Sequence, residues 1–198
     1  VDRDGFTTTV QTKDRLQQYA GVDFLTPQAY QKVMCIYRRD QNGNVPAFVT
    51  SYYENGQISQ YRDLVNSRAF GSYQEWYENG KLKLSAQVVG GDGDLSEAAA
   101  KTWVFDGPCE AWDKLGNLEA TIYYDKGSLE QESLYYHPSG QIQKRVPYHL
   151  GEICGRAEIY DQSNKVIETA DYEAGLLHGP SQRFFDDGAL AAEEHFER

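Results

Sequence analysis

Basic residues, cysteine, proline and long apolar runs are all scarce in this sequence, and several of these scarcities exclude a class of protein. Lysine and arginine number 19 against 30 aspartates and glutamates, which gives a formal net charge of −11 over 198 residues. That charge opposes any general attraction to nucleic-acid phosphates or to anionic lipid. No apolar run approaches the roughly 18 residues of a membrane-spanning helix. We therefore expect no nucleic-acid partner and no membrane association through this chain itself.

The few sulfur-containing residues carry little functional signal. Cys35, Cys109 and Cys154 cannot all pair within one chain, and their spacing fits neither a zinc ribbon nor a redox pair. We expect buried or unreactive thiols. Because the chain starts at Val1 and its single methionine is Met34, we expect that it is not a complete translation product. A signal or anchor could have been removed, so the sequence leaves the compartment open, cytoplasmic or exported.

What the sequence does contain is a repeat of 24 residues. One slot is filled by Gly56, Gly80, Gly116, Gly140, Asn164 and Gly188, spaced by 24 residues except for one interval of 36. The longer interval is one period with 12 inserted residues. We refer to this slot as the turn slot.

Apolar residues recur at fixed distances from the turn slot. Four residues before it stand Tyr52, Trp76, Trp112, Tyr136, Tyr160 and Phe184, all aromatic. Two residues after it stand Ile58, Leu82, Leu118, Ile142, Val166 and Leu190, all branched aliphatic. Eight residues after it stand Leu64, Val88, Tyr124, Tyr148, Tyr172 and Phe196. Six matching copies exclude coincidence, and repeats of this length indicate stacked structural units.

Each unit has the sequence of a β-hairpin. Its turn residues include segments such as Glu78-Asn79-Gly80-Lys81, with glycine where the backbone needs a positive φ. Asn164 fits the same slot, because asparagine tolerates the left-handed region best among non-glycine residues. A second turn lies 11 residues further on, at Gly91, Gly127, Gly151 and Gly175. Two turns about a dozen residues apart leave room for two strands and no helix.

One hairpin of this size cannot bury enough apolar surface to be stable alone, whereas stacked hairpins share a continuous apolar stripe. We therefore predict an all-β fold, an elongated antiparallel meander of repeated hairpins over residues 47–198. The aromatics before the turn slot and the aliphatics after it should line one face. Residues 1–46 form a separate N-terminal cap region in this prediction.

The N-terminal region predicts a small α/β cap on the first sheet edge. Residues 13–20 favour a short helix that ends at Gly21, and Thr26-Pro27 favours another helical turn. Residues 32–38 and 45–53 favour strands joined by a turn at 41–44. The last strand, 189–196, has no such cap. We expect it to be a protected edge, to continue into further residues, or to pair with a partner or a second copy.

The 12-residue insertion, near residues 92–103, has its own local signals. Ser96 is a suitable N-cap for a helical turn over residues 97–101. We expect this loop to project from one edge of the sheet. Asp92 and Asp94 suggest calcium, but Glu97 and Trp103 stand where an EF-hand loop needs glycine and an acidic residue. We therefore predict no metal site.

The sequence contains none of the common catalytic motifs. It lacks a glycine-flanked serine, a phosphate-binding loop, a dinucleotide fingerprint and a His-Glu-x-x-His pair. The four histidines (His137, His149, His178 and His195) share no slot of the repeat. We predict that the protein is not an enzyme and holds no cofactor.

The repeat itself resembles a known family. Gly71-x4-Trp76-Tyr77-Glu78-Asn79-Gly80-Lys81-Leu82 and the same pattern from Gly179 to Leu190 resemble the MORN repeat variant of bacterial proteins grouped as YwqK-type antitoxins. The resemblance covers about 150 residues. It implies hairpin repeats, a scaffolding or partner-binding role and no catalytic residues.

These observations favour a non-catalytic scaffold for protein–protein interaction. Paired aromatics place one ring of each pair on either face of the sheet, and insertions in repeat proteins often bind partners. The predicted contact residues are Tyr53, Tyr77, Leu95, Trp103, Tyr123 and Tyr135. Alternatives are a lipid-headgroup or carbohydrate-binding module, or an antitoxin that neutralises a partner toxin.

Overall fold

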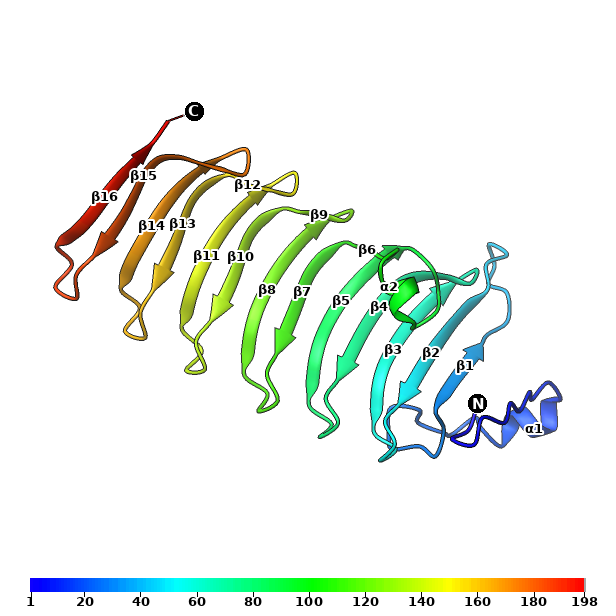
Figure 1. Ribbon diagram of the computed structural model, residues 1–198. Helices are drawn as coiled ribbons and strands as arrows, with labels where there is room; N and C mark the ends of the chain where they lie inside the picture. Colours follow the sequence, from blue (N-terminus) through cyan, green and yellow to red (C-terminus); the bar gives the residue numbers. More distant parts are fainter. Residues whose placement is uncertain (198) are drawn as a thin grey trace. The chain divides into compact units, whose positions relative to one another are not determined.

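The computed structural model describes residues 1–197, which form antiparallel strands and two short helices, α1 (Lys13–Gln17) and α2 (Glu97–Ala100) (Figure 1). β1 (Lys32–Ile36) comes first. The strands before the turn slot are β2 (Pro46–Tyr52), β4 (Arg68–Trp76), β7 (Gly107–Trp112), β10 (Gln131–Tyr136), β13 (Gly155–Tyr160) and β15 (Leu176–Phe184). Those after it are β3 (Ile58–Val65), β5 (Leu82–Gly90), β8 (Leu118–Asp125), β11 (Ile142–His149), β14 (Val166–Glu173) and β16 (Leu190–Phe196).

The strands follow one another through a single open sheet. The order is β1-β2-β3-β4-β5-β7-β8-β10-β11-β13-β14-β15-β16. Three two-residue strands, β6 (Val104–Phe105), β9 (Ser128–Leu129) and β12 (Glu152–Ile153), pair beside this path. Neighbours in sequence are therefore neighbours in the sheet, which confirms the predicted all-β meander of repeated hairpins.

The turn slot has the backbone conformation that the sequence predicts. Its five glycines have φ between 80° and 92°, and Asn164 has φ 62°. In the Asn164 copy, the Asp161 carboxylate also accepts hydrogen bonds from the amides of Ser163 and Lys165, at 2.8 and 2.9 Å. The left-handed conformation is thus a property of the slot and not of glycine.

Asn164 provides a direct test of this requirement. Replacing it with glycine should raise the free energy of unfolding by about 0.5 kcal/mol, because glycine reaches positive φ without steric strain. Replacing it with valine should lower that free energy by about 1 to 2 kcal/mol, because β-branched residues rarely adopt this conformation. Urea unfolding of the two variants measures both effects. Equal stability of the two would contradict a conformational requirement at this slot.

A β-bulge recurs beside the turn slot in the hairpins β2–β3, β7–β8, β10–β11, β13–β14 and β15–β16, and it sets the two faces of the sheet. The aromatic before the turn slot and the aliphatic after it are opposite one another, as in Trp112↔Leu118 and Tyr160↔Val166, which confirms that they share a face. The register shifts immediately next to this pair. Because one extra residue reverses the alternation, the residue eight after the turn slot, such as Tyr124, lies on the other face. We call that side face A and the side of Trp112 and Leu118 face B.

The chain divides into two compact units. Unit 1 comprises Val1–Lys83 and Val88–Trp103, and unit 2 comprises Leu84–Gln87 with the residues from Val104 onward. In unit 1, Val49 and Leu64 are buried on face A and Thr50 and Tyr52 on face B. The described part of unit 2 contains strands and their turns but no helix. The predicted division at residue 46 stays a prediction, since these units group the N-terminal region with the first repeats.

The N-terminal region covers face B of unit 1. The Tyr52 hydroxyl donates to the Phe24 carbonyl at 2.8 Å, and the Phe24 and Phe48 rings lie 6.2 Å apart. The helix predicted for residues 13–20 is shorter, because α1 ends at Gln17. The helical turn predicted at Thr26-Pro27 is wrong, because Thr26 lies in a turn where its hydroxyl donates to the Asp23 carbonyl. A proline start signal alone does not sustain a helix without an apolar face to bury. No helix in the described residues is long and apolar enough to span a membrane.

Candidate functional site

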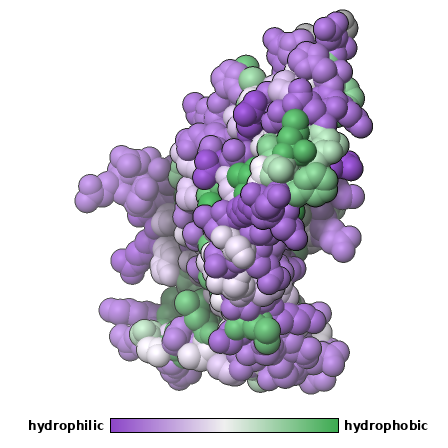
Figure 2. Space-filling model, turned by 90° about the vertical axis from the view of Figure 1, so that its left-hand side faces the viewer, coloured by the Kyte–Doolittle hydropathy of each residue, from purple (hydrophilic) through white to green (hydrophobic). Residues whose placement is uncertain are grey.

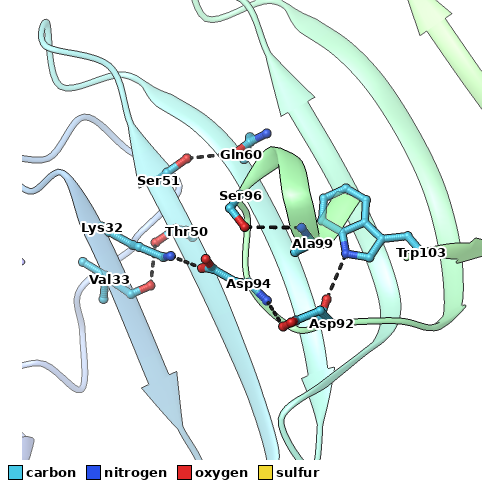
Figure 3. A network of polar contacts seen from close by, with 10 residues as sticks. All are labelled: Lys32, Val33, Thr50, Ser51, Gln60, Asp92, Asp94, Ser96, Ala99 and Trp103. Atoms are coloured by element: carbon cyan, nitrogen blue, oxygen red, sulfur yellow. Dashed lines mark hydrogen bonds and ion pairs between the residues drawn. The ribbon is translucent and has the colours of Figure 1, made fainter. Parts of the chain in front are cut away.

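The inserted segment folds back over face A of unit 1 (Figure 3). Leu95 packs against the buried cluster of Ala47, Val49 and Leu64. The prediction that this loop projects from a sheet edge is therefore wrong. Burial of Leu95 on an apolar surface explains the difference, because a projecting loop would leave both exposed to water.

Polar contacts fix the insertion at both ends. Asp94 forms an ion pair with Lys32 of β1. The Trp103 indole N–H donates to the Asp92 carbonyl at 2.9 Å, and the Asp92 amide donates to the Thr102 hydroxyl at 2.8 Å. Figure 3 shows Lys32 of β1 pointing toward Asp94 of the insertion. The two aspartates that suggested calcium are thus engaged within the chain.

The short helix in the insertion forms as predicted. Ser96 is the N-cap of α2, and its hydroxyl accepts a hydrogen bond from the Ala99 amide at 3.3 Å. The backbone before it needs glycine for close approach. A side chain at Gly93 would place its Cβ 2.6 Å from the Ser67 carbonyl oxygen and 2.9 Å from Leu64. At Gly91, where φ is +122°, the Cβ would lie 2.6 Å from the Thr102 carbonyl oxygen.

Beneath the insertion lies a buried arginine between two aromatic rings. The Arg62 guanidinium carbon lies 3.3 Å from the centre of the Trp103 ring and 4.2 Å from that of Tyr73. Arg62 is 0% exposed, and its three side-chain nitrogens have no hydrogen-bond partner. Burial lowers the pKa of Arg62 to about 10. Two cation–π contacts therefore replace the ion pair that a buried cation usually requires.

Glu75 is an acidic residue that interacts electrostatically with Arg62, but its carboxylate forms hydrogen bonds with other residues. Glu75 accepts hydrogen bonds from the Tyr73 hydroxyl and, at 2.8 Å, from the Lys83 ammonium group. Burial acts to raise the pKa of Glu75, but these hydrogen bonds outweigh burial and lower it. The sequence did not predict the role of Arg62, because nothing in a single sequence distinguishes a buried arginine on a strand from an exposed one.

In unit 2, face A is lined by tyrosines in repeat register. Tyr124, Tyr148 and Tyr172 lie eight residues after the turn slot, and Tyr135 lies opposite Lys144 on the same face. All four rings are half-buried. No hydrogen bond within the described residues involves their hydroxyl groups, whereas the hydroxyls of Tyr52, Tyr53, Tyr61, Tyr73 and Tyr160 all bond within the chain. Face A of unit 2 therefore carries amphipathic rings with unused polar ends.

The predicted contact residues do not form one surface. Tyr53 lies beside a turn, and its hydroxyl donates to the Trp76 carbonyl of the next repeat at 2.7 Å. Tyr77 holds the same position in the next repeat, where its amide donates to the Lys81 carbonyl. Tyr123 is on face B and Tyr135 on face A of unit 2. Leu95 and Trp103 contact unit 1 itself, so binding of a partner by these residues stays a prediction.

The described residues contain no group of three or more histidine, cysteine or acidic residues that could hold a metal ion. A pocket of about 360 Å³ at the base of the insertion is lined by Ser67, Arg68, Gly91, Asp92 and Thr102.

None of the cysteines in the described chain forms a disulfide, and burial raises the pKa of Cys35. A raised pKa makes that thiol less reactive.

The surface carries no large apolar area in the view of Figure 2, where hydrophobic residues form small patches within a mostly hydrophilic surface. Exposed apolar side chains of unit 2 include Leu150, Leu176, Phe185 and Leu190. Interfaces outside obligate complexes are about as apolar as the rest of a surface, and aromatic residues distinguish them. The tyrosines of face A are therefore a better candidate for recognition than these scattered aliphatic residues.

Comparison with known proteins finds a similar repeat in three segments of the chain. The family described as the MORN repeat variant matches residues 49–66, 71–88 and 129–149. These segments contain the turn slots at Gly56, Gly80 and Gly140, so three of the six copies are recognised. No curated protein matches the chain significantly. The repeat family is consistent with a scaffold or binding module and is generally non-enzymatic. Over these three segments, the chain is similar to the MORN repeat variant.

Proposed function

We propose that the protein is a non-catalytic repeat scaffold that binds a protein partner on face A of unit 2. One observation carries the proposal: the four tyrosines of that face present half-buried rings whose hydroxyls make no hydrogen bond within the described chain. On the same face of unit 1, the chain supplies its own cover through Leu95 and Trp103. In unit 1, this side of the sheet thus carries a second layer, which supports the same use of face A in unit 2.

The chemistry of tyrosine suits such a surface. A tyrosine ring adds a large apolar contact area at a low cost in conformational entropy, and its hydroxyl can bond to the partner backbone. Tyr124, Tyr148 and Tyr172 recur with the repeat, so a partner can contact several in succession. Small buried residues, Ser133, Ala157 and Ala170, lie on the same face between these rings. Alternating large and small residues make the surface uneven, so partner side chains can pack between the tyrosine rings.

Affinity capture from the native organism tests this proposal with matched variants. Replacing both Tyr135 and Tyr148 with alanine should lower recovery of the main captured protein at least about ten-fold, since each anchor ring contributes 1 kcal/mol or more to binding. Tyr123→Ala removes a neighbouring ring from face B and should change recovery less than about two-fold. Circular dichroism checks that all variants are folded.

Two outcomes would contradict the proposal. One is unchanged recovery with the double variant, and the other is an equal loss with Tyr123→Ala. Deletion of residues 92–103 is a poorer test of a binding site, because it uncovers Leu64 and Arg62 and so disturbs unit 1 itself. The tyrosine variants leave that unit intact.

A further inference from the structure

Unit 2 repeats, on face A, the strand pairings that the insertion covers in unit 1. In β1–β2–β3 the register is Lys32↔Ser51, Val49↔Arg62 and Ala47↔Leu64. In β11–β13–β14 the equivalent register is Lys144↔Ile159, Ala157↔Ala170 and Gly155↔Tyr172. Equivalent residues of β2 and β13, and of β3 and β14, lie at the same distance in sequence from their own turn slots, Gly56 and Asn164. The equivalent positions therefore allow a residue-by-residue comparison of the covered and the uncovered surface.

Lys144 takes the place of Lys32 in this comparison. Lys32 is paired with Asp94 of the insertion. Lys144 is exposed, and no ion pair in the described residues involves it. Arg183, also on face A, lies 3.7 Å from Glu168, so these two charges offset each other and Lys144 is left as a cation that the printed ion pairs do not neutralise. A carboxylate on a partner complements this position.

The apolar part of the surface is also repeated, with smaller side chains at the positions of Ala47 and Val49 and a larger one at that of Leu64. In unit 1, Leu95 rests on Ala47, Val49 and Leu64. The equivalent residues of unit 2 are Gly155, Ala157 and Tyr172. Ala170 stands where unit 1 has Arg62, whose side chain and covering Trp103 fill that position. A partner side chain larger than leucine can therefore approach the sheet more closely at Ala157 and Ala170 than the insertion does at Val49 and Arg62.

We propose that the partner presents a short segment with an acidic residue next to a large apolar one, as in Asp94-Leu95 of the insertion. Its carboxylate pairs with Lys144, and its apolar side chain packs on Ala157, Ala170 and Tyr172. The insertion of unit 1 is then an intramolecular example of the ligand that unit 2 takes from another protein. This inference rests on the proposed function and specifies the chemistry of the partner.

A labelled synthetic peptide with the sequence of residues 91–103 serves as the probe, and fluorescence anisotropy measures its binding to the full chain. We expect weak binding, with a Kd on the order of 1 mM, because a free peptide must be ordered on binding. Lys144→Glu should weaken binding about five-fold, the effect of one partly exposed charge pair. Lys126→Glu, which makes the same charge change in the turn between β8 and β9, should leave the Kd within about two-fold.

A charge exchange makes the test specific. A peptide in which lysine replaces Asp94 should bind the wild-type chain about five-fold more weakly and should regain affinity for the Lys144→Glu variant. NMR amide shifts should change at Ala157, Ala170 and Tyr172. No binding at 5 mM peptide (about five times the expected Kd), equal effects of Lys144→Glu and Lys126→Glu, or shift changes confined to Val49 and Leu64 would each overturn the inference.

The outcomes separate this inference from the proposed function. If the peptide does not bind but the Tyr135→Ala and Tyr148→Ala double variant still loses its captured protein, face A binds a partner of different chemistry. If the peptide binds as expected while that variant captures normally, the acidic–apolar site exists but does not hold the native partner. Each result thus contradicts one proposal and leaves the other standing.

Discussion

Replacing Trp103 with alanine should lower the free energy of unfolding of unit 1 by about 3 kcal/mol. The change removes the ring that covers the Arg62 guanidinium at 3.3 Å, together with the apolar contact that holds the end of the insertion. Trp103 is half-buried, and hydration of the uncovered guanidinium offsets part of the loss, so the expected effect is at the lower end for tryptophan-to-alanine changes. Differential scanning calorimetry should show a melting temperature roughly 6 to 12 °C lower.

Trp103→Phe is the matched control for this prediction. Phenylalanine keeps a ring over Arg62 but loses the indole hydrogen bond to the Asp92 carbonyl. It should therefore lose only about 1 kcal/mol. Hydrogen exchange at β3 and β4 assigns the effect to unit 1. A Trp103→Ala protein as stable as the wild type would mean that the insertion does not close unit 1 in solution.

Replacing Arg62 with methionine should stabilise the protein, in contrast to Trp103→Ala, and raise the free energy of unfolding by about 2 kcal/mol at pH 7. Arg62 is fully buried without a hydrogen-bond partner, and its lowered pKa reports that the folded state disfavours the charge. Methionine has a similar reach, is uncharged and makes favourable contacts with aromatic rings. Urea unfolding at pH 7 measures the gain, and a loss of stability would show that the cation–π contacts outweigh burial of the charge.

The same variant gives a pH dependence with a defined sign. The pKa of Arg62 is about 10 in the folded chain against 12.5 ordinarily, so the unfolded chain binds more protons between these values. Wild-type stability therefore gains from this group as the pH rises through that range. The advantage of Arg62→Met should shrink by about 1 kcal/mol between pH 7 and pH 10.5. The raised pKa values of Tyr61 and Tyr73 act in the opposite direction, but both proteins contain these tyrosines, so their effect largely cancels in the difference.

Features that depend on neighbouring residues could be predicted from the sequence. The left-handed turn at Asn164, the Ser96 cap of α2 and the pairing of Tyr160 with Val166 all involve residues only a few positions apart. Their geometry follows from steric limits on the backbone and from short hydrogen bonds. The six-fold recurrence then fixed the class of fold, since repeated hairpins of one length can only be stacked.

The candidate site required contacts between distant residues. Asp94 pairs with Lys32, which is 62 positions away, and Trp103 covers Arg62. Local signals predicted the short helix of the insertion but not the direction in which the insertion folds. The β-bulge was missed as well, although it decides that Tyr123 and Tyr135 lie on opposite faces. Without the bulge, alternation alone assigns the residues beyond each turn to the wrong side.

The sequence by itself determined the repeat, the hairpins, their turns and the meander of strands, because each of these follows from a short-range steric or hydrogen-bonding rule applied six times. The tertiary structure decided which face of unit 1 the insertion covers and which tyrosines of unit 2 share an uncovered face. The first of these depends on contacts of Leu95 and Lys32 with residues far away in the sequence, and the second depends on the β-bulges, which reverse the alternation of side chains. A periodic sequence specifies its strands locally, but only the folded sheet brings together residues that lie several repeats apart.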